Sequence, residues 1–335
     1  MDNVILVLTN SKDGQHTDVV ISKLRQQNQR VFRFDADIFA DGELQLNFCT
    51  SKNLFGFEIT GADGIVSLAD IKSVWYRRPN SLHLKLKDPV QRMYAEEEIM
   101  NLLEGLWMSM PDAFWLNNPT YLNAARKKVY QLFLAREAGF RVPKTIITNN
   151  PERVEEFFNE CGGRIVFKAI QGELLDYGEK SFSIPATLVT NRHLENLDLV
   201  KHTPSLLQEF VEKAYELRIT VVGDEIFPVK IEPLVDISHA VDWRYPELMD
   251  KLSYSPTVLP ERISAFCFWL LRKLRLSFGA LDFVVGRDGK TYFLEINPNG
   301  QWYWLEDRTG LLISDAIVGM LRKISPRRFS QQHAP

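Results

Sequence analysis

The chain has few cysteines and no cysteine pair at metal-binding spacing. Cys49, Cys161 and Cys267 are the only three among 335 residues, and they stand far apart. Structural zinc sites and the disulfide frameworks of small secreted proteins both need closely spaced cysteines, so the sequence favours neither. The six histidines also lack the spacing of metal ligands. The scattered thiols indicate a reducing environment, and we expect a cytoplasmic protein.

The chain also lacks a long apolar run and a large charge of one sign. It has 40 basic and 43 acidic residues, a net charge of −3, so no basic field for nucleic acid is expected. The apolar run 4–8 is too short for the hydrophobic region of a signal peptide. The most apolar helical segment, 266–276, is interrupted by Arg272, Lys273 and Arg275. Such a segment is not suited to cross a bilayer, so no membrane partner is expected either.

Apolar periodicity predicts an α/β protein. Residues 4–9 form an apolar run, 17–28 carry an amphipathic helical pattern, and 31–34 form a second apolar run. This strand–helix–strand order is typical of a parallel sheet. The length allows two or three domains with ample core. Turn residues at 115–119 close the first unit, and one helix is predicted over 123–139.

The segment 279–300 carries the most specific pattern in the chain. Asp288-Gly289 separates two apolar, β-rich runs, which predicts a hairpin with a two-residue turn. In that register Asp282 lies directly opposite Glu295. Asn297 shares their face of the sheet, because side chains alternate along a strand. Two carboxylates and one amide oxygen therefore converge on one patch.

Such an acidic patch suggests a bound cation. Two like charges about 5 Å apart repel by about 3 kcal/mol at an effective dielectric constant near 20, and directly opposed like charges destabilise a hairpin. A divalent cation reverses that sign, and a set of oxygen ligands suits Mg²⁺ with phosphates and water completing its octahedron. The sequence predicts a magnesium–nucleotide site here. The alternative is an acidic, solvated hairpin.

With this hairpin in place, residues 115–322 resemble the ATP-grasp ligases, which join carboxylates to nucleophiles and hold Mg·ATP between two sheet subdomains. Lys128 and Lys168 resemble the two phosphate-contacting lysines of the family, with Lys127 as the competing choice for the first. Glu216 resembles the acid that holds the ribose hydroxyls. Asp282, Glu295 and Asn297 resemble the Mg²⁺ ligands. The segment that resembles the adenine-binding hinge strand is Gln208, Glu209, Phe210 and Val211.

A narrower resemblance extends along most of the chain. It is to the graspetide synthetases, typified by the microviridin macrocyclases, and it is carried by segments 32–35, 75–78, 216–223, 242–244 and 294–298. The resemblance implies an ATP-grasp fold preceded by a small Rossmann-like domain. The expected parts are an N-terminal domain 1–118, a central subdomain 119–205, a C-terminal subdomain 206–325 and a flexible tail 326–335.

The same resemblance implies the chemistry. Such enzymes use ATP to phosphorylate Asp or Glu side chains of a ribosomally made precursor peptide, then join them to Ser/Thr hydroxyls or Lys amines as macrocycles. Arg218 shares a strand face with Glu216, and we expect it at the γ-phosphate or acyl phosphate. Arg244 is expected at the substrate carboxylate or the tetrahedral intermediate, with Asp242 as candidate general base. Alternatively, Asp242 and Arg244 form an ion pair that stabilises a loop.

The helix predicted over 191–201 departs from the family. In microviridin-type members it begins with acidic residues that meet an arginine of the leader peptide, whereas this chain has Arg192 and His193 there. We expect a leader with an acidic or apolar residue at that point, with Leu194 and Leu197 as the alternative contacts. Lys230 replaces an expected small residue and is assigned no role. A homodimer is what the family suggests.

Two other functions and one local question stay open at this level. The chain can be a ligase that adds a free amino acid to a protein or metabolite carboxylate, or a silent nucleotide- or peptide-binding module. The intact acidic and lysine positions argue against the silent module. The aromatic run 302–304 can contact a peptide or fill the core between the hairpin and the last helix, and core packing is the favoured interpretation.

Overall fold

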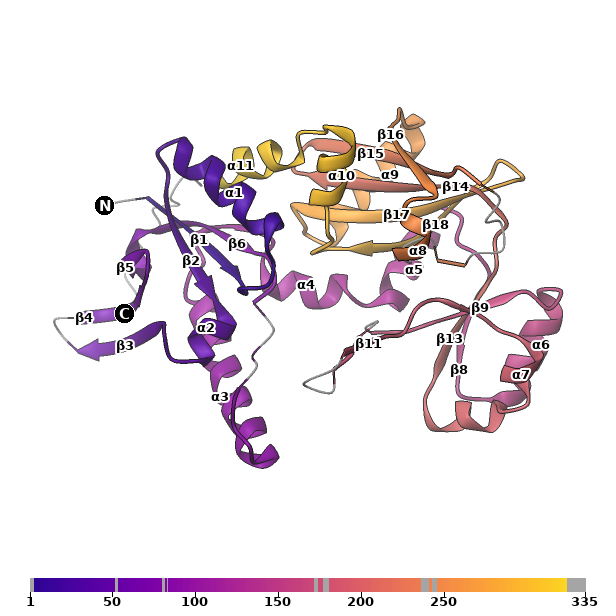
Figure 1. The fold of residues 1–335 in the computed structure, drawn as a ribbon, viewed down its shortest axis with the longest axis horizontal. Coiled ribbons are helices and arrows are strands. Elements are labelled where there is room, and N and C mark those ends of the chain that lie inside the picture. The colour runs from indigo at the N-terminus through magenta and orange to yellow at the C-terminus, as the bar shows by residue number, and fades with distance from the viewer. Residues whose placement is uncertain are drawn as a thin grey trace.

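The structure is a computed structural model that describes residues 3–51, 54–79, 82, 84–171, 174–176, 181–235, 241–242 and 246–323. Its described part contains three sheet-based units (Figure 1). The N-terminal sheet and the C-terminal sheet lie side by side. A smaller central unit lies below the C-terminal sheet in this view. No helix in the described part is long and apolar enough to cross a membrane.

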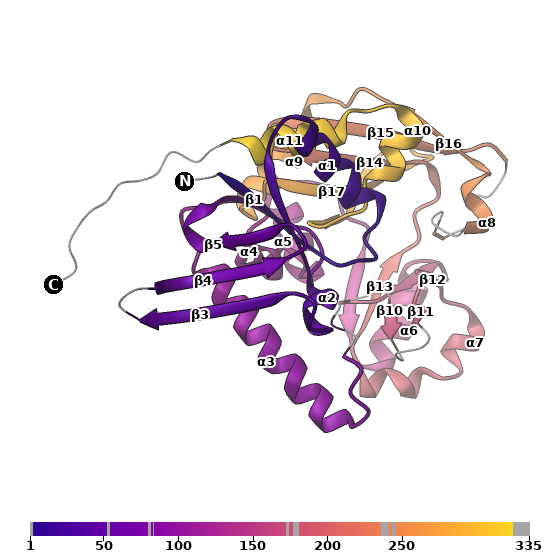
Figure 2. The ribbon, with the colours of Figure 1, turned by 60° about the vertical axis from the view of Figure 1, so that its left-hand side comes forward.

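The N-terminal unit is the expected parallel sheet. Its strand order is β2-β1-β6-β7, with α1 (Gln15–Gln26) linking the first two strands. β1 is buried at every position, because a parallel strand covered on both faces contacts no water. A separate antiparallel sheet, β3-β4-β5, projects from the body (Figure 2). The strands of the two sheets are β1 (Val4–Thr9), β2 (Arg30–Asp35), β6 (Ile71–Tyr76), β7 (Phe114–Leu116), β3 (Gln45–Ser51), β4 (Leu54–Gly61) and β5 (Gly64–Ser67). Two further helices are α2 (Ala36–Ala40) and the long α3 (Pro89–Met108).

The central unit is a small antiparallel sheet in the order β12-β9-β13-β8. One face packs on α6 (Pro151–Glu160), whose Val154 and Phe157 are buried. The strands are β8 (Thr145–Thr148), β9 (Ile165–Lys168), β12 (Thr187–Leu188) and β13 (Ser205–Glu209), with a nearby hairpin of β10 (Leu174–Asp176) and β11 (Ser181–Ser183). β13 pairs with β8 and β9, so the change of sheet falls after Glu209, a few residues beyond the expected 205/206 boundary.

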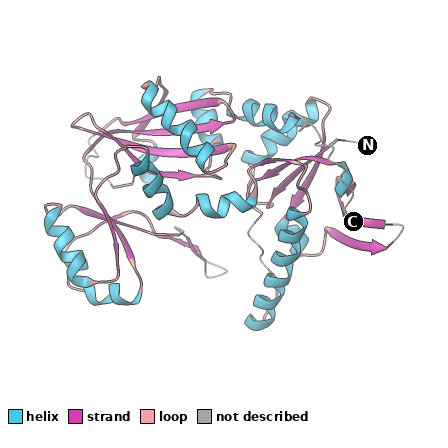
Figure 3. Cartoon of the chain, turned by 180° about the vertical axis from the view of Figure 1, so that it is seen from behind, coloured by secondary structure: helices cyan, strands magenta, loops and turns pink. Residues whose placement is uncertain are grey.

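The C-terminal sheet is antiparallel, in the order β16-β15-β14-β17-β18. Helix α9 (Glu261–Lys273) covers one face, and α10 (Tyr303–Thr309) and α11 (Ile313–Arg322) pack against the other. Seen from behind, a helix crosses these strands directly (Figure 3). The strands are β14 (Lys213–Val222), β15 (Glu225–Pro233), β16 (Leu252–Pro256), β17 (Phe278–Gly286) and β18 (Thr291–Asn297), and α8 (Pro246–Met249) precedes β16. The pattern did not predict β16 or α10.

The helix predicted over 123–139 is wrong in one respect, because the structure has two helices there. α4 (Pro119–Ala125) ends before Lys127, whose extended backbone begins α5 (Lys128–Glu137). The buried Gln131 explains the break. Its amide nitrogen donates to the carbonyl of Ala125 at 2.6 Å and to that of Ile296 at 2.9 Å, and its oxygen accepts from the Ile296 amide at 3.1 Å. The side chain thus ends α4 and ties α5 to β18.

The helix predicted over 191–201 is also shorter than expected. α7 covers Asn191–Leu194, and a 3₁₀ turn follows over Leu197–His202. The capping box of Thr190 and His193 starts α7, and Leu194 and Leu197 pack against the central core. Arg192 is exposed.

Candidate active site

The β17–β18 hairpin brings the predicted carboxylates together by a route that the sequence did not predict. The turn is not the expected two-residue turn. Gly289 donates to the carbonyl of Gly286, Gly286 donates to that of Lys290, and Gly289 has φ +74°, which is a three-residue loop ending in a left-handed residue. This loop alone would place Leu294 opposite Asp282. A β-bulge between Asp282 and Phe283 corrects the register.

Leu294 is the extra residue of that bulge. Phe293 pairs with Phe283 and Glu295 pairs with Asp282, so Leu294 has no cross-strand partner. The bulge lets Phe293 and Ile296 both enter the core, at 0% and 2% exposure, while Leu294 lines the cleft beside Glu295. The loop and the bulge offset each other, and Asp282 lies opposite Glu295 as predicted.

Both carboxylates are paired with cations from this chain. Arg218, directly opposite Asp282 on β14, donates from Nη1 to both carboxylate oxygens at 2.8 and 2.7 Å. Lys128 Nζ lies 3.2 Å from Glu295 Oε2 and donates to the carbonyl of Ala169 at 2.9 Å. Neither ion pair is freely exposed, since the side chains are 11% to 23% exposed. The patch thus combines acidic oxygens with two cationic side chains that are long enough to turn toward a bound phosphate.

The donor set fits a hard cation. Asn297 is exposed on the same hairpin, and its Oδ1 accepts from the Asn299 amide at 3.0 Å, which fixes the orientation of the side chain. Within the described residues no group of three or more His, Cys, Asp or Glu side chains forms a metal cluster. The predicted set has two carboxylates and one amide oxygen, which suits Mg²⁺ shared with phosphate ligands rather than an all-protein cage.

A cleft of about 400 Å³ opens beside this patch, between the central sheet and the C-terminal sheet. Lys168 lies on one wall, and its Nζ donates to Gln208 Oε1 at 2.7 Å, whose amide in turn donates to Thr145 Oγ1 at 3.0 Å. Lys127 is exposed, whereas Lys128 is half-buried. The structure gathers six of the predicted nucleotide residues around the cleft: Lys168, Gln208, Glu209, Phe210, Val211 and Glu216.

Several residues of the cleft were not predicted from the sequence. Lys213 is buried, forms an ion pair with Glu216 and donates to the carbonyl of Val241 at 2.9 Å. The apolar walls are Pro143, Val166, Val241, Val284 and Leu294. Strand alternation identifies only Val284 in advance, because it lies two residues from Asp282 on the same strand. Leu294 enters the cleft only because of the bulge, and the others come from separate segments that only the fold brings together.

Three remaining candidates have different outcomes. Asp242 is half-buried near the cleft residue Val241. Arg244 lies outside the described residues. Lys230 pairs with Leu217 across β14 and β15, so it lies on the opposite face of the sheet from Arg218. Lys230 stacks over the Tyr215 ring at 4.4 Å and forms an ion pair with Glu232. It is therefore not part of the cleft.

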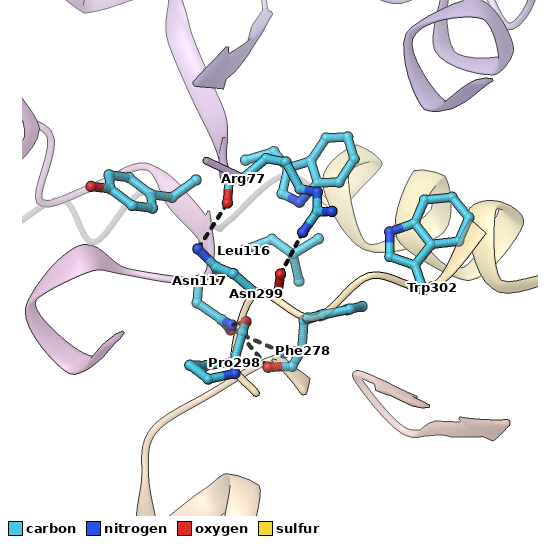
Figure 4. A pocket seen from close by; sticks show the side chains of 9 residues that line it. Arg77, Leu116, Asn117, Phe278, Pro298, Asn299 and Trp302 are labelled. Carbon is cyan, nitrogen blue, oxygen red and sulfur yellow. Dashed lines mark hydrogen bonds between the residues drawn. The ribbon is translucent and has the colours of Figure 1, made fainter. Parts of the chain in front are cut away.

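A second, smaller pocket lies where the N-terminal and C-terminal sheets meet (Figure 4). Arg77 Nη1 donates to the Asn299 carbonyl at 2.6 Å, and Asn299 Nδ2 donates back to the Arg77 carbonyl at 2.8 Å. Arg77 also forms a buried ion pair with Asp13 at 3.1 Å. Burial lowers the pKa of Arg77 to about 10, so the side chain stays charged at neutral pH. The fully buried Trp302 lines this pocket, as expected of core packing.

The two sheet subdomains around a cleft, with paired carboxylates beside it, define an ATP-grasp ligase. A family model described as the MvdD pre-ATP grasp domain matches residues 4–123. The macrocyclase MdnC from Microcystis aeruginosa MRC, solved with its precursor peptide MdnA, is 31% identical, with a TM-score of 0.84 over 95% of this chain and 99% of that one.

Other matches agree with this class. A RiPP-associated ATP-grasp ligase from Chryseobacterium gregarium, solved with ADP and a leader and core peptide, is 31% identical, with a TM-score of 0.86 over 97% of this chain and 98% of that one. The curated α-aminoadipate–LysW ligase LysX of Sulfurisphaera tokodaii is 29% identical over 111 residues, which span 33% of this chain and only 39% of LysX. The chain belongs to the family of peptide-modifying ATP-grasp ligases that includes MdnC.

Proposed function

We propose that this enzyme uses ATP to activate Asp or Glu side chains of a ribosomally made precursor peptide and joins them to Ser/Thr hydroxyls or Lys amines of the same peptide. The observation that best supports this proposal is that Arg218, Asp282 and Glu295 lie in one row across β14, β17 and β18, beside the cleft. Identity to peptide-modifying relatives along nearly the whole chain supports the peptide substrate.

The cleft is suited to hold ATP. Its apolar walls, including Val284 and Leu294, suit the adenine ring, and residues 208–211, which line the same cleft, would contact the edge of the ring. Glu216 suits the ribose hydroxyls. Lys168 and Lys128 each bring one compact positive charge for phosphate oxygens. On ATP binding, these lysines would exchange their present protein acceptors for phosphate.

Asp282, Glu295 and Asn297 would hold Mg²⁺, which neutralises phosphate charge during transfer. The pairing of Arg218 with Asp282 and of Lys128 with Glu295 supports this assignment, because the patch already attracts cations. Once its carboxylate partner is shared with a metal ion, Arg218 is free to contact the transferring phosphoryl group. A guanidinium is suited to that charge by its two parallel donors.

The reaction would proceed in two steps. A carboxylate oxygen of the peptide attacks the γ-phosphorus of ATP, and ADP leaves with the electrons of the broken P–O bond. A hydroxyl or amine then attacks the acyl phosphate carbon, inorganic phosphate leaves, and a base takes the proton of the nucleophile. We assign that base to Asp242 and the stabilisation of the tetrahedral intermediate to Arg244. Positioning and charge neutralisation would carry most of the rate.

We further propose that the leader docks beside α7, near Arg192 and His193, and that the enzyme is a homodimer. Leu194 and Leu197 are only partly available to a leader because they pack against the central core. Light scattering after gel filtration tests the dimer, and a mass of one chain would contradict it.

A direct assay tests the function. Peptides from short reading frames beside the gene, with repeated Thr/Ser and Glu/Asp near their C-termini, are incubated with enzyme and Mg·ATP. ADP release and the loss of one water mass per ring are expected, and hydroxylamine should trap the acyl phosphate as a hydroxamate. Peptides with Gln and Asn in place of Glu and Asp are the control. ADP release that needs a free amino acid, with a gain of peptide mass, would instead support the amino-acid ligase.

A further inference from the structure

The N-terminal sheet reverses its strand order next to the loop that follows the predicted metal-binding strand. Its order β2-β1-β6-β7 reverses direction between β1 and β6, and open parallel sheets bind ligands at the carboxyl ends of the strands on either side of such a point. After β1 come Asn10 and Asp13, and after β6 come Arg77 and Arg78. Asn10 Nδ2 donates to the Arg78 carbonyl at 2.7 Å, which holds the two segments together.

The loop that follows the predicted metal-binding strand contacts the residues that follow β6. Arg77 Nη1 donates to the carbonyls of Asn299 and Gly300 at 2.6 and 3.3 Å, and Arg78 Nη2 donates to that of Asn299 at 3.3 Å. From the other side, Arg218 Nη2 donates to the carbonyl of Gln301 at 3.2 Å. Three guanidinium groups therefore meet at three consecutive carbonyls, directly beyond Asn297.

Around this loop, the arginine side chains outnumber the carboxylates that pair with them. Arg77 is paired with Asp13 and Arg218 with Asp282. Arg78 and Arg126, by contrast, form no ion pair with a carboxylate in the part of the chain that the structure describes. Burial lowers the pKa of Arg78, and the nearby charges of Arg126 and Arg218 lower it further, against an opposing effect of Asp13. Clustered guanidinium groups without a counter-ion are unfavourable, and a bound anion would reverse that energy.

We propose that Arg78 and Arg126 bind the side-chain carboxylate of the substrate that is to be phosphorylated. This inference rests on the proposed function and adds the N-terminal domain to its active site. Arg78 follows β6 and Arg126 follows α4. Arg78 lies close enough to Arg126 and to Arg218 for their charges to act on it, and Arg218 holds Asp282 of the metal patch. A carboxylate held by this pair would lie beside the metal patch, where we expect the γ-phosphate. Two guanidinium groups also select a carboxylate over a neutral amide.

Binding of small probes by calorimetry tests the pair. The probe is N-acetylglutamic acid α-methylamide, its neutral match is the glutamine compound, and each is titrated with and without Mg·ADP. The unaltered enzyme should bind the acidic probe at least tenfold more tightly than the neutral one. Arg126→Gln and Arg78→Gln should both lose that preference and keep their affinity for Mg·ADP. Arg126 is exposed, so its variant is expected to fold even if the Arg78 variant does not.

Lys127→Gln is the matched control, because Lys127 is exposed and adjacent to Arg126. Its preference for the acidic probe should equal that of the unaltered enzyme. The proposal is overturned if the unaltered enzyme binds both probes equally, or if Arg126→Gln keeps the full preference. Failure of the unaltered enzyme to bind Mg·ADP would count against the proposed function instead.

Discussion

Asp282 lies directly opposite Glu295, and the extra residue Leu294 is what keeps them in register. The three-residue loop shifts the two strands by one position, and the bulge shifts them back. The acidic pair is thus maintained by two irregularities, each of which would separate it alone. Such compensation beside the cleft supports a functional role for the pair, because bulges are common next to active sites.

Removal of one charge from this pair should stop catalysis. Glu295→Gln keeps the shape of the side chain but weakens the proposed Mg²⁺ site, so ADP release should fall by about 100-fold or more. The melting temperature should change little. Glu97→Gln, on an exposed part of α3, is the control. Near-normal ADP release by Glu295→Gln at saturating Mg²⁺ would contradict the metal assignment.

Lys168 and Lys127 should differ in their contribution to nucleotide binding. Lys168→Ala removes a charge from the wall of the cleft, whereas Lys127→Ala alters an exposed side chain. A loss of about tenfold or more in ATP affinity is expected for the first and almost none for the second. Calorimetric titration with Mg·ATP measures both. Equal losses would show that the lysine assignment is wrong.

Gly300 lies in the loop that Arg77 and Arg218 contact, and it should not accept a side chain. A Cβ there would lie 2.5 Å from the Ala280 Cβ and 3.0 Å from Arg218 Nη2. Gly300→Ala should therefore destabilise the fold by about 1–3 kcal/mol and reduce ADP release by displacing Arg218. Gly319→Ala, in an open position on α11, should instead stabilise by about 0.5–1 kcal/mol. Denaturant unfolding measures both, and a neutral Gly300→Ala would contradict the tight packing.

Stability should fall in mild acid because of His16. Burial, followed by the charge of Arg77, lowers the pKa of His16 from 6.5 to about 4. In that interval the unfolded chain binds a proton that the folded protein does not, so the stabilisation present above pH 6.5 is lost as the pH falls toward 4. The loss should be on the order of 2 kcal/mol, allowing for partial exposure of the ring. Urea unfolding of the enzyme and of His16→Gln compares the slopes; exposed His202→Gln is the control, and parallel curves for all three would contradict the prediction.

The leader should carry an acidic or apolar residue where it meets Arg192. The side chain is exposed, and an arginine-bearing leader would meet a like charge there. Arg192→Glu should weaken binding of the true leader and strengthen that of an arginine-bearing one, as followed by fluorescence anisotropy. Arg153→Glu, exposed on α6, is the control. Tight binding of the arginine-bearing leader to the unaltered enzyme would rule the idea out.

The sequence predicted most of what depends on local pattern. Continuous apolar runs indicated the buried strands, and alternation placed Arg218 on the face of Glu216. The break before Lys128 was not predictable, because it depends on Gln131 bonding to Ile296, which is 165 positions away. The loop and the bulge of the hairpin were not predicted for a related reason. Asp-Gly favours a two-residue turn locally, and core packing of Phe293 and Ile296 decided between the alternatives.

Residues from separate units were the hardest to predict. The Arg77–Asn299 pair joins positions 222 apart in the chain, and no periodicity links them. The burial of Arg77 was not predictable either, because an Arg-Arg dipeptide more often lies on a solvated surface. The aromatic run was easier, because three large side chains together usually supply core, and Trp302 is fully buried.

The contacts of β18 also limit how a peptide can approach the metal patch. β18 ends its sheet, and edge strands usually offer free backbone groups to which an extended peptide can add as a further strand. Here Gln131 occupies both backbone groups of Ile296, and the Phe293 amide donates to the carbonyl of Arg141 at 2.9 Å. The backbone beside Glu295 is closed to strand addition. An incoming chain must therefore reach the carboxylates by extending one side chain toward them, which leaves its own backbone free to bend into a ring.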